Sequence, residues 1–247
     1  MKILLLDIET APSLAYVWGL WDENIPLERL INPGYMLCWA AKWLGEEDVF
    51  FASKHETSTK KMLKPLHKLL DEADAVIHYN GTRFDIPHIN REFVLNGFTP
   101  PSPYKQMDLL WTVKKQFKFA SNKLQHVAVE LGVGEKMKHD GFELWVRCIA
   151  GDKEAWQQMQ SYNVQDVVLL EKVYNVLVPW VKGHVNHSLH NPDERVCPHC
   201  GSTHLQKRGV YHTLASVFQR YRCKACGTWS KDNKVLNRKE YKTTEVN

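Results

Sequence analysis

The sequence predicts an α/β protein: a mixed sheet flanked by helices, followed by a small β module at the C-terminal end. Three observations favour this fold class. Strand-like segments dominate residues 1–79, but one segment with helical periodicity lies between them. Amphipathic helical patterns follow over residues 107–178. The last stretch, of about 50 residues, is too short to build a good core unaided, and it holds four of the six cysteines.

The first half of the sequence alternates strand and helix signals. Strands are expected where apolar, β-branched or aromatic runs end at turn residues, and a helix where apolar residues recur at helical spacing. In chain order these are a strand over 2–6, strands over 35–43 and 49–52 joined by a turn at 45–48, a helix over 60–72, and a strand over 75–79.

The second half is mostly helical until the tail. A helix over 87–96 is followed by Gly97, and a proline-rich loop leads to helices over 107–117, 122–131 and 154–178. Residues 181–195 are rich in His, Asn and Gly and lack apolar periodicity, which is typical of a linker. The predicted organisation is a main domain over 1–182, a linker over 183–194 and a module over 195–247.

Composition excludes several broad classes. Hydrophobic residues make up 44% and charged residues 24% of the chain, which is a globular balance and excludes a disordered or fibrous chain. The apolar run near the start spans only residues 3–6, too short for a membrane span or a signal peptide. We therefore expect a cytoplasmic protein that does not bind a membrane.

Short motifs bring carboxylates to the ends of predicted elements. Asp7 and Glu9 lie two residues apart at the end of the first strand, so both side chains point to one face. Asp85 follows the turn after the fourth strand, and Asp166 shares a helix face with Tyr162. Each has an ordinary interpretation as a strand end, a helix N-cap or a polar flank. Two carboxylates that face one way repel each other unless a cation lies between them, but the Asp7–Glu9 pair taken alone favours the ordinary strand end.

Taken together, the motifs resemble those of the DEDD-type 3′–5′ exonucleases of the ribonuclease H-like superfamily, in their tyrosine-containing (DEDDy) branch. Residues 7–10 resemble the first motif, Asp-x-Glu. Residues 80–87 are similar to the second motif as it occurs in proofreading domains of B-family DNA polymerases, and residues 162–166 resemble the third, Tyr-x-x-x-Asp. The resemblance covers about residues 1–180 and implies a ribonuclease H-like sheet flanked by helices.

The resemblance also implies a two-metal hydrolysis of phosphodiester bonds, with two Mg²⁺ or Mn²⁺ ions held by carboxylates. Asp7 would bridge both ions. Glu9 and Asp166 would complete the site that holds the attacking water. Asp85 would act mainly at the second ion, partly through water, and Tyr162 would orient the attacking water or help to deprotonate it.

Candidate substrate contacts have weaker signals. Asn80 matches a motif position that, by the resemblance, would position the strand or the bound nucleotide. Lys114 and Lys115 lie among aromatic residues, and cations interleaved with aromatic rings can follow a nucleic-acid backbone. A solvated amphipathic helix with its aromatic side chains in the core is the alternative. Asp108 is either a supporting carboxylate or a helix N-cap, and the cap is favoured.

Two Cys-x-x-Cys-Gly motifs in the tail predict a structural zinc site. They span residues 197–201 and 223–227, with 22 residues between the cysteine pairs. This gap slightly exceeds the usual range of about 15–20 residues, and a β-hairpin over 211–221 would fill it. A redox motif or unrelated thiols would not predict two motifs that both end in Gly. The segment resembles zinc ribbons, with one Zn²⁺ held by Cys197, Cys200, Cys223 and Cys226.

Charge is divided unevenly along the chain, whose net charge is +4. Residues 1–185 carry 21 Lys and Arg against 23 Asp and Glu, whereas residues 186–247 carry 11 against 5. A ribbon this basic, beside a set of nuclease motifs, favours phosphate binding, and Arg220 and Arg222 are its candidate contacts. Cys38 and Cys148 lie alone in apolar surroundings and are expected to be buried thiols.

The sequence therefore predicts a metal-dependent 3′–5′ exonuclease that acts on DNA, at single-stranded 3′ ends, with the zinc ribbon adding grip on nucleic acid. Two alternatives stay open within the enzyme class: an RNA exonuclease and a structure-selective endonuclease on the same scaffold. A third alternative is a non-catalytic nucleic-acid-binding protein that acts through the ribbon. A polymerase or a replication or repair partner fits the motifs, but the sequence identifies no contact for it.

Overall fold

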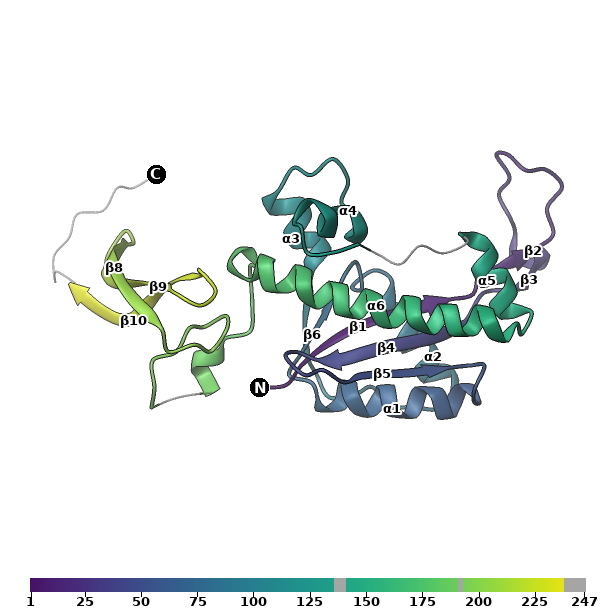
Figure 1. The fold of residues 1–247 in the computed structure, drawn as a ribbon, viewed down its shortest axis with the longest axis horizontal. Helices are drawn as coiled ribbons and strands as arrows, with labels where there is room; N and C mark the ends of the chain where they lie inside the picture. The colour runs from purple at the N-terminus through teal and green to yellow at the C-terminus, as the bar shows by residue number, and fades with distance from the viewer. Residues whose placement is uncertain (136–140, 191–192, 238–247) are drawn as a thin grey trace. The chain divides into compact units, whose positions relative to one another are not determined.

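The computed structural model describes residues 1–135, 141–190 and 193–237 (Figure 1). The chain divides into two compact units, Lys2–Val173 and Tyr174–Asn247, with Met1 assigned to the second. Residues 191–192 of the predicted linker and 238–247 of the predicted zinc-ribbon module lie outside the described residues. Within the described ranges, no helix combines the length and apolar character needed to span a bilayer.

A mixed sheet forms the centre of the unit Lys2–Val173. In the described residues it has five strands in the order β5-β4-β1-β6-β7. β1 pairs antiparallel with β4 and parallel with β6, while β4–β5 is antiparallel and β6–β7 is parallel. The strands are β1 (Ile3–Thr10), β4 (Met36–Trp43), β5 (Val49–Ser53), β6 (Ala75–His78) and β7 (Lys105–Asp108).

Helices cover both faces of this sheet, which confirms the predicted fold class. They are α1 (Thr59–Glu72), α2 (Asp85–Leu95), α3 (Leu109–Gln116), α4 (Leu124–Glu130), α5 (Phe142–Ile149) and α6 (Lys153–Leu177). Figure 1 shows α6 running across one face of the sheet and α1 lying against the other. In α1, the apolar positions that predicted the helix are all buried: Met62, Leu63, Leu66, Leu69 and Leu70.

Side-chain alternation along β1 divides the core into two layers. Leu4, Leu6 and Ile8 belong to the apolar cluster formed with α1 and α2. Because successive side chains of a strand point to opposite faces, Asp7 and Glu9 face the other layer. That layer contains residues of α5 and α6, among them Tyr162. One face of β1 is thus apolar along its length, while the other face begins with the buried Ile3 and Leu5 and ends with the two carboxylates, on the side of α6.

Several short elements differ from the sequence prediction. A small hairpin, β2 (Leu14–Ala15) with β3 (Leu30–Asn32), and the helix α5 were not predicted. The helix expected over 107–117 begins at Leu109, because Met107 and Asp108 belong to β7. β7 gives almost no strand signal, since Met107 is its only buried residue. Single helical turns occur at η1 (Leu27–Arg29), η2 (Val178–Trp180) and, within the predicted linker, η3 (His187–His190).

The unit Tyr174–Asn247 contains an antiparallel sheet. Its described part has three strands in the order β10-β9-β8: β8 (Leu205–His212), β9 (Val217–Cys223) and β10 (Trp229–Asn237). The β8–β9 pair contains the hairpin predicted over 211–221. A small polar and aromatic cluster packs in this unit: Tyr174 donates a 2.6 Å hydrogen bond to His184, whose ring stacks on His199 at 4.7 Å.

Candidate active site and zinc site

The carboxylates of Asp7, Glu9 and Asp166 converge. One carboxylate oxygen from each lies within 4.8 Å of the other two. Asp7 pairs with Ala40 and Glu9 with Cys38 across the β1–β4 ladder, so the backbone positions of both are fixed by the sheet. Asp166 comes from α6 and is only 2% exposed. One strand and one helix thus bring together the three carboxylates that the resemblance assigns to a metal site.

This donor set fits a divalent metal ion. Mg²⁺ and Mn²⁺ prefer oxygen ligands, and carboxylates supply both the oxygen and the compensating charge. Three carboxylates held this close in a half-buried site repel one another unless a cation or a proton neutralises them. The residues present therefore match an oxygen-liganded metal site.

Asn163 contacts Asp7 and was not predicted as a site residue. Its side chain is fully buried, and its Nδ2 donates a 2.7 Å hydrogen bond to Oδ2 of Asp7. On its other side, the Cys38 thiol lies 3.7 Å from the Asn163 carbonyl oxygen. This contact fixes the amide, and the amide in turn positions the carboxylate. One sequence signal could have pointed to Asn163. It is an uncharged polar residue directly after Tyr162, in a helix segment whose other residues are partly apolar and core-facing.

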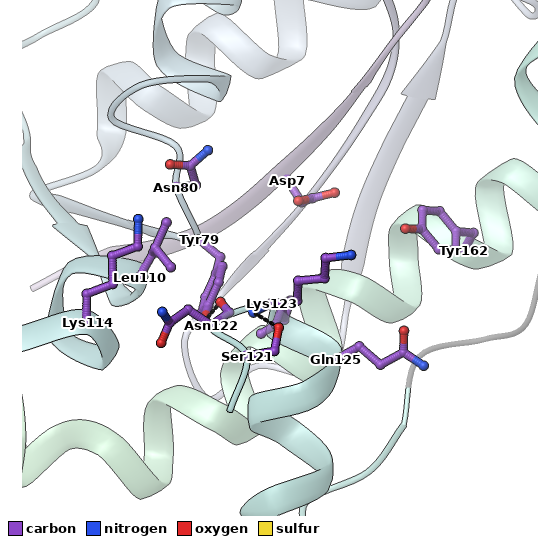
Figure 2. Close-up of a pocket in the computed structure, with 11 residues that line it drawn as sticks. Asp7, Tyr79, Asn80, Leu110, Lys114, Ser121, Asn122, Lys123, Gln125 and Tyr162 are labelled. Carbon is purple, nitrogen blue, oxygen red and sulfur yellow. Dashed lines mark hydrogen bonds between the residues drawn. The ribbon is translucent and has the colours of Figure 1, made fainter. Parts of the chain in front are cut away.

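Tyr162 lies one helical turn before Asp166. Its ring is 7% exposed and meets Trp145 edge to face, with centroids 5.9 Å apart. Figure 2 shows its hydroxyl pointing into a pocket that Asp7 also lines. The packing of the ring fixes the direction of the phenol, whose hydroxyl faces the pocket that Asp7 lines.

Asp85 lies near this cluster but outside the 4.8 Å group. It is the first residue of α2, whose N-cap is Phe84, so the alternative interpretation of Asp85 as the cap does not hold. Its carboxylate is 3% exposed and accepts a 3.1 Å hydrogen bond from the backbone N–H of Ile8. Burial raises the pKa of Asp85 to about 7. A cation nearby would favour the ionised form.

Asp108 organises the loop that carries Asn80. The carboxylate caps α3 by accepting from the N–H of Leu110 at 3.0 Å, which confirms the predicted N-cap. It also accepts from the N–H groups of Asn80 at 2.9 Å and Thr82 at 3.3 Å. Asn80 has a φ of 70°, a conformation that asparagine tolerates better than most residues. One buried carboxylate thus fixes both the helix start and the loop.

A pocket of about 570 Å³ adjoins the carboxylates (Figure 2). Asp7 and Tyr162 lie on one side of it, and Asn80 and Lys114 line it further along. Lys115, the other predicted lysine, is not among its lining residues, whereas Lys123 is. The loop that carries Lys123 is held by a 2.6 Å hydrogen bond from the Tyr79 hydroxyl to the Asn122 carbonyl. The lining is completed by Tyr79, Leu110, Ser121, Asn122, Leu124 and Gln125.

Sequence comparison places this unit in a known superfamily. A model of the RNase_H superfamily matches residues 35–178. The chain belongs to this superfamily. Membership supports a nuclease and the dependence on divalent metal ions for which the carboxylate cluster is suited. A comparison with curated protein sequences found no match.

A comparison with solved structures found a protein with a similar fold. The structure is similar to that of the family B DNA polymerase from the hyperthermophilic archaeon Pyrobaculum calidifontis, with a TM-score of 0.52 and 18% sequence identity. The match covers 72% of this chain and 24% of the polymerase chain. The matched part of this chain therefore corresponds to about a quarter of the polymerase, and at this identity the match shows the fold alone.

In the unit Tyr174–Asn247, the four cysteines predicted to bind zinc lie close together. All four Sγ atoms lie within 4.8 Å of one another. The Cys197–Cys226 and Cys200–Cys223 sulfur distances are 3.6 and 3.7 Å. Sulfurs bound tetrahedrally to zinc at about 2.3 Å would be about 3.8 Å apart, while a disulfide would need about 2.05 Å. The geometry fits a Cys₄ zinc site.

Backbone geometry at both cysteine motifs supports the same site. Gly201 and Gly227 have φ values of 71° and 81°, which glycine adopts without strain. Their N–H groups donate to the carbonyls of Cys197 and Cys223, closing the two tight turns. Burial opposes ionisation of the Cys223 thiol, but backbone N–H donors outweigh it and lower its pKa to about 7. A thiolate at Cys223 suits a metal ligand, whereas burial raises the pKa of Cys197 and raises that of Cys200 to about 11, so these two thiols would ionise only with a cation bound.

The two isolated cysteines behave as predicted. Cys38 and Cys148 are buried. Desolvation raises the pKa of Cys38 well above its usual value, helped by the nearby Glu9 and Asp7, and raises the pKa of Cys148 to about 11. Neither thiol is a nucleophile at neutral pH.

Proposed function

We propose that the protein is a metal-dependent 3′–5′ exonuclease that acts at single-stranded 3′ ends of DNA and releases nucleoside monophosphates. The observation that carries this proposal is the convergence of Asp7, Glu9 and Asp166, with carboxylate oxygens within 4.8 Å, at a pocket that Asp7 and Tyr162 both line. Superfamily membership supports the nuclease chemistry. The resemblance of residues 80–87 to polymerase proofreading motifs favours DNA and the 3′–5′ direction.

Two Mg²⁺ or Mn²⁺ ions would be held by Asp7, Glu9 and Asp166, with Asp85 at the second ion. When bound, they would stabilise the charge on the attacking and leaving oxygens of the phosphodiester. The buried Asp85 supports this assignment, since its raised pKa marks a carboxylate that lacks a charge partner in the described structure. In this proposal the four carboxylates act only as metal ligands.

The remaining residues would bind and orient the reactants. Asn163 holds the Asp7 carboxylate in one orientation. Tyr162 would accept or donate a hydrogen bond to the attacking water, which adds to phosphorus as the bond to the 3′-oxygen breaks. Lys114 and Lys123, which line the pocket, would contact the phosphates of the terminal nucleotides, with Asn80 beside them. The pocket has the volume of a small-ligand site.

The deciding experiment uses end-labelled single- and double-stranded DNA and RNA with Mg²⁺ or Mn²⁺. We expect stepwise shortening from the 3′ end of single-stranded DNA, abolished by Asp7→Ala and by Asp166→Ala. Glu154→Ala is the matched control, because this α6 carboxylate is 89% exposed and should leave the rate unchanged.

Other outcomes of the same assay decide between the alternatives. Activity that survives either Asp7→Ala or Asp166→Ala would contradict the site assignment. Internal cuts would favour the structure-selective endonuclease, and digestion of RNA alone would favour the RNA exonuclease. Binding without any cleavage would favour the non-catalytic protein that acts through its ribbon.

We further propose that residues 195–247 form a zinc ribbon, attached by a linker over 183–194 to a nuclease domain over 1–182, and that the ribbon adds affinity for nucleic acid. Arg220 and Arg222 are the proposed contacts. Elemental analysis should give about one zinc ion per chain, lost on Cys223→Ser. A zinc-free wild-type protein that retains the same fold would contradict the ribbon.

A further inference from the structure

One face of the β8–β9–β10 sheet carries aromatic and cationic side chains together. Strand register assigns them to one face: Tyr211 lies opposite Phe218, Lys231 opposite Arg220, and Trp229 opposite Arg222. We call this surface the aromatic face; it consists of Tyr211, Phe218, Arg220, Arg222, Trp229 and Lys231.

The cations of the aromatic face lie over its rings. The Arg220 guanidinium is 4.7 Å from the Trp229 ring, and the Lys231 ammonium is 3.8 Å from the Phe218 ring. Arg220 also donates to the Arg208 carbonyl at 2.9 Å, which fixes the direction of its side chain. The rings and the charges are therefore ordered with respect to each other.

The placement of Arg220 directly opposite Lys231 is unfavourable for the isolated sheet. Like charges that face each other across two strands repel. The neighbouring rings offset part of this repulsion through cation–π attraction. An anion bound between the two cations would remove the rest, which makes this pair suitable for a phosphate.

The opposite face of the sheet is packed by the chain itself. Tyr221 is 5% exposed there, with the Arg195 guanidinium 4.9 Å from its ring. Arg195 also forms a 2.8 Å ion pair with Asp232. On the aromatic face, by contrast, Trp229 is 51% and Tyr211 is 45% exposed. Large rings left accessible on only one of two faces indicate a binding surface.

The spacing of the rings distinguishes between single and double strands. Phe218 and Arg222 are four residues apart along β9, which corresponds to about 13 Å, and Tyr211 and Trp229 lie opposite them. Bases in a duplex rise about 3.4 Å per nucleotide and hide their faces in the stack. Rings about 13 Å apart can stack only on bases whose faces are exposed, as in an extended single strand.

We propose that the aromatic face binds single-stranded nucleic acid by stacking bases on Trp229 and on Tyr211, with phosphates held between them by Arg220 and Lys231. This deepens the proposed function, on which it rests for the choice of nucleic acid as ligand. The charge balance agrees: residues 193–237 carry 8 Lys and Arg against 3 Asp and Glu. An acidic protein segment would match the charges but would leave the exposed rings without partners.

The test uses the full chain with Asp7→Ala and a fluorescent, phosphorothioate-linked single-stranded oligonucleotide of about 20 nucleotides, longer than one binding site. Fluorescence anisotropy should show that Trp229→Ala weakens binding about tenfold or more, and that Trp229→Phe restores most of it. Trp18→Ala is the matched control, because Trp18 is 89% exposed but belongs to the other unit. Zinc content and circular dichroism check that each variant is folded.

A second ligand separates stacking from charge. An abasic oligonucleotide of the same length keeps the phosphates but lacks bases, so it should bind the parent protein more weakly and should not respond to Trp229→Ala. Arg220→Gln should reduce the slope of log affinity against log salt by about 0.7. Lys207→Gln should leave it unchanged, because Lys207 lies opposite Tyr221 on the other face.

Three results would overturn the proposal: equal binding of the abasic and normal strands, no effect of Trp229→Ala, or a preference for duplex. Cleavage assays on the same variants keep this separate from the active site. If Asp7→Ala still cleaves, the proposed function fails while the binding data continue to test the aromatic face. If cleavage behaves as expected but Trp229→Ala binds normally, only the aromatic face is wrong.

Discussion

Asn163 helps to orient the Asp7 carboxylate. It is buried between Cys38 and Asp7, and its amide can satisfy both because it carries an acceptor and a donor. A carboxylate that loses such a partner can rotate, and a rotated oxygen no longer meets the metal in the same geometry. Asn163 is therefore a positioning residue in the proposed mechanism.

We predict that Asn163→Leu lowers kcat by about 10- to 100-fold, with KM for the oligonucleotide unchanged and with a higher Mg²⁺ concentration needed for half-maximal rate. Leucine keeps the volume but cannot donate to Asp7. Steady-state kinetics with a Mg²⁺ titration measures both effects, and Ser161→Ala, on the exposed side of α6, is the control. An unchanged Mg²⁺ dependence would show that Asn163 has only a structural role.

Gly81 is fixed by a close approach. A Cβ atom at this position would lie 2.4 Å from Cγ of His78, whose side chain is fully buried. We predict that Gly81→Ala lowers the free energy of unfolding by about 1–3 kcal/mol. The buried His78 ring has no room to move, so the loop that carries residue 81 must shift instead.

Urea denaturation measures this change, and Gly19→Ala is the matched control. A Cβ at Gly19 would have 3.9 Å to its nearest neighbour, a flexible Glu23 oxygen. A Gly81→Ala protein as stable as the Gly19→Ala protein would show that the loop adapts without cost. If the loop moves, Asn80 should move with it, so the affinity for single strands is a second readout.

At the scale of elements, the geometry of the candidate active site depends on how α6 is fixed to the sheet. Lys42 of β4 forms an ion pair with Glu171 of α6, and both side chains are largely buried, at 7% and 14% exposed. Glu171 also accepts a 2.8 Å hydrogen bond from the N–H of Gly45 in the β4–β5 turn. Asp166 lies in the same helix, so this pair holds the helix that supplies the third carboxylate.

We predict that Lys42→Met destabilises the fold by about 3 kcal/mol, since it leaves the Glu171 carboxylate buried without its partner. The double variant Lys42→Met with Glu171→Met should recover most of this loss, because no unpaired charge remains. Chemical denaturation of the two single variants and the double variant forms the cycle. A coupling energy near zero would mean that the pair does not fasten the helix.

Elements with strong periodicity were predictable, and those built on few buried residues were not. α1 and α6 carry long apolar stripes, and β1 and β4 are buried for most of their length, so their patterns match their structures. β7 was missed because its place in the sheet is set by pairing with β6, an interaction that leaves no periodic signal in four residues. The candidate carboxylates were predictable as a set through the resemblance of three short motifs, while strand alternation alone placed only Asp7 and Glu9 on one face.

The contacts that sequence reasoning missed are non-local. Asn163 and Asp7 are 156 residues apart, and Asp108 reaches back 28 residues to the Asn80 N–H. Lys123 lines the pocket while Lys115 does not, because the loop before α4 is held by the Tyr79 hydroxyl. No spacing rule relates these residues, since tertiary packing alone brings them together.

At the scale of the whole molecule, the two units are stabilised by different means. Lys2–Val173 has large apolar clusters on both faces of its sheet. In the described part of Tyr174–Asn247, the strands β8 and β10 are mostly exposed, and the well-buried side chains include Cys197 and Cys223 themselves. A module of this size with so small a core needs additional stabilisation, and the proposed zinc ion would supply it.

Removing zinc should therefore unfold one unit and spare the other. With a strong chelator at neutral pH, we expect loss of the β8–β10 sheet, because thiolates brought together without a cation repel and the small core cannot hold them. Hydrogen exchange should show loss of protection over residues 205–237 and unchanged protection in β1, β4 and α1. Cys223→Ser should give the same pattern without chelator, whereas Cys148→Ser should keep its zinc, since Cys148 lies outside the cysteine cluster.

Protection that is lost in both units together would show that the zinc site stabilises the whole chain, and retained protection in β9 would show that the sheet folds without metal. Nuclease activity on short oligonucleotides is a second readout. If the zinc site stabilises the whole chain, this activity should disappear with the zinc. Under our proposal it should persist, while the affinity for long single strands falls.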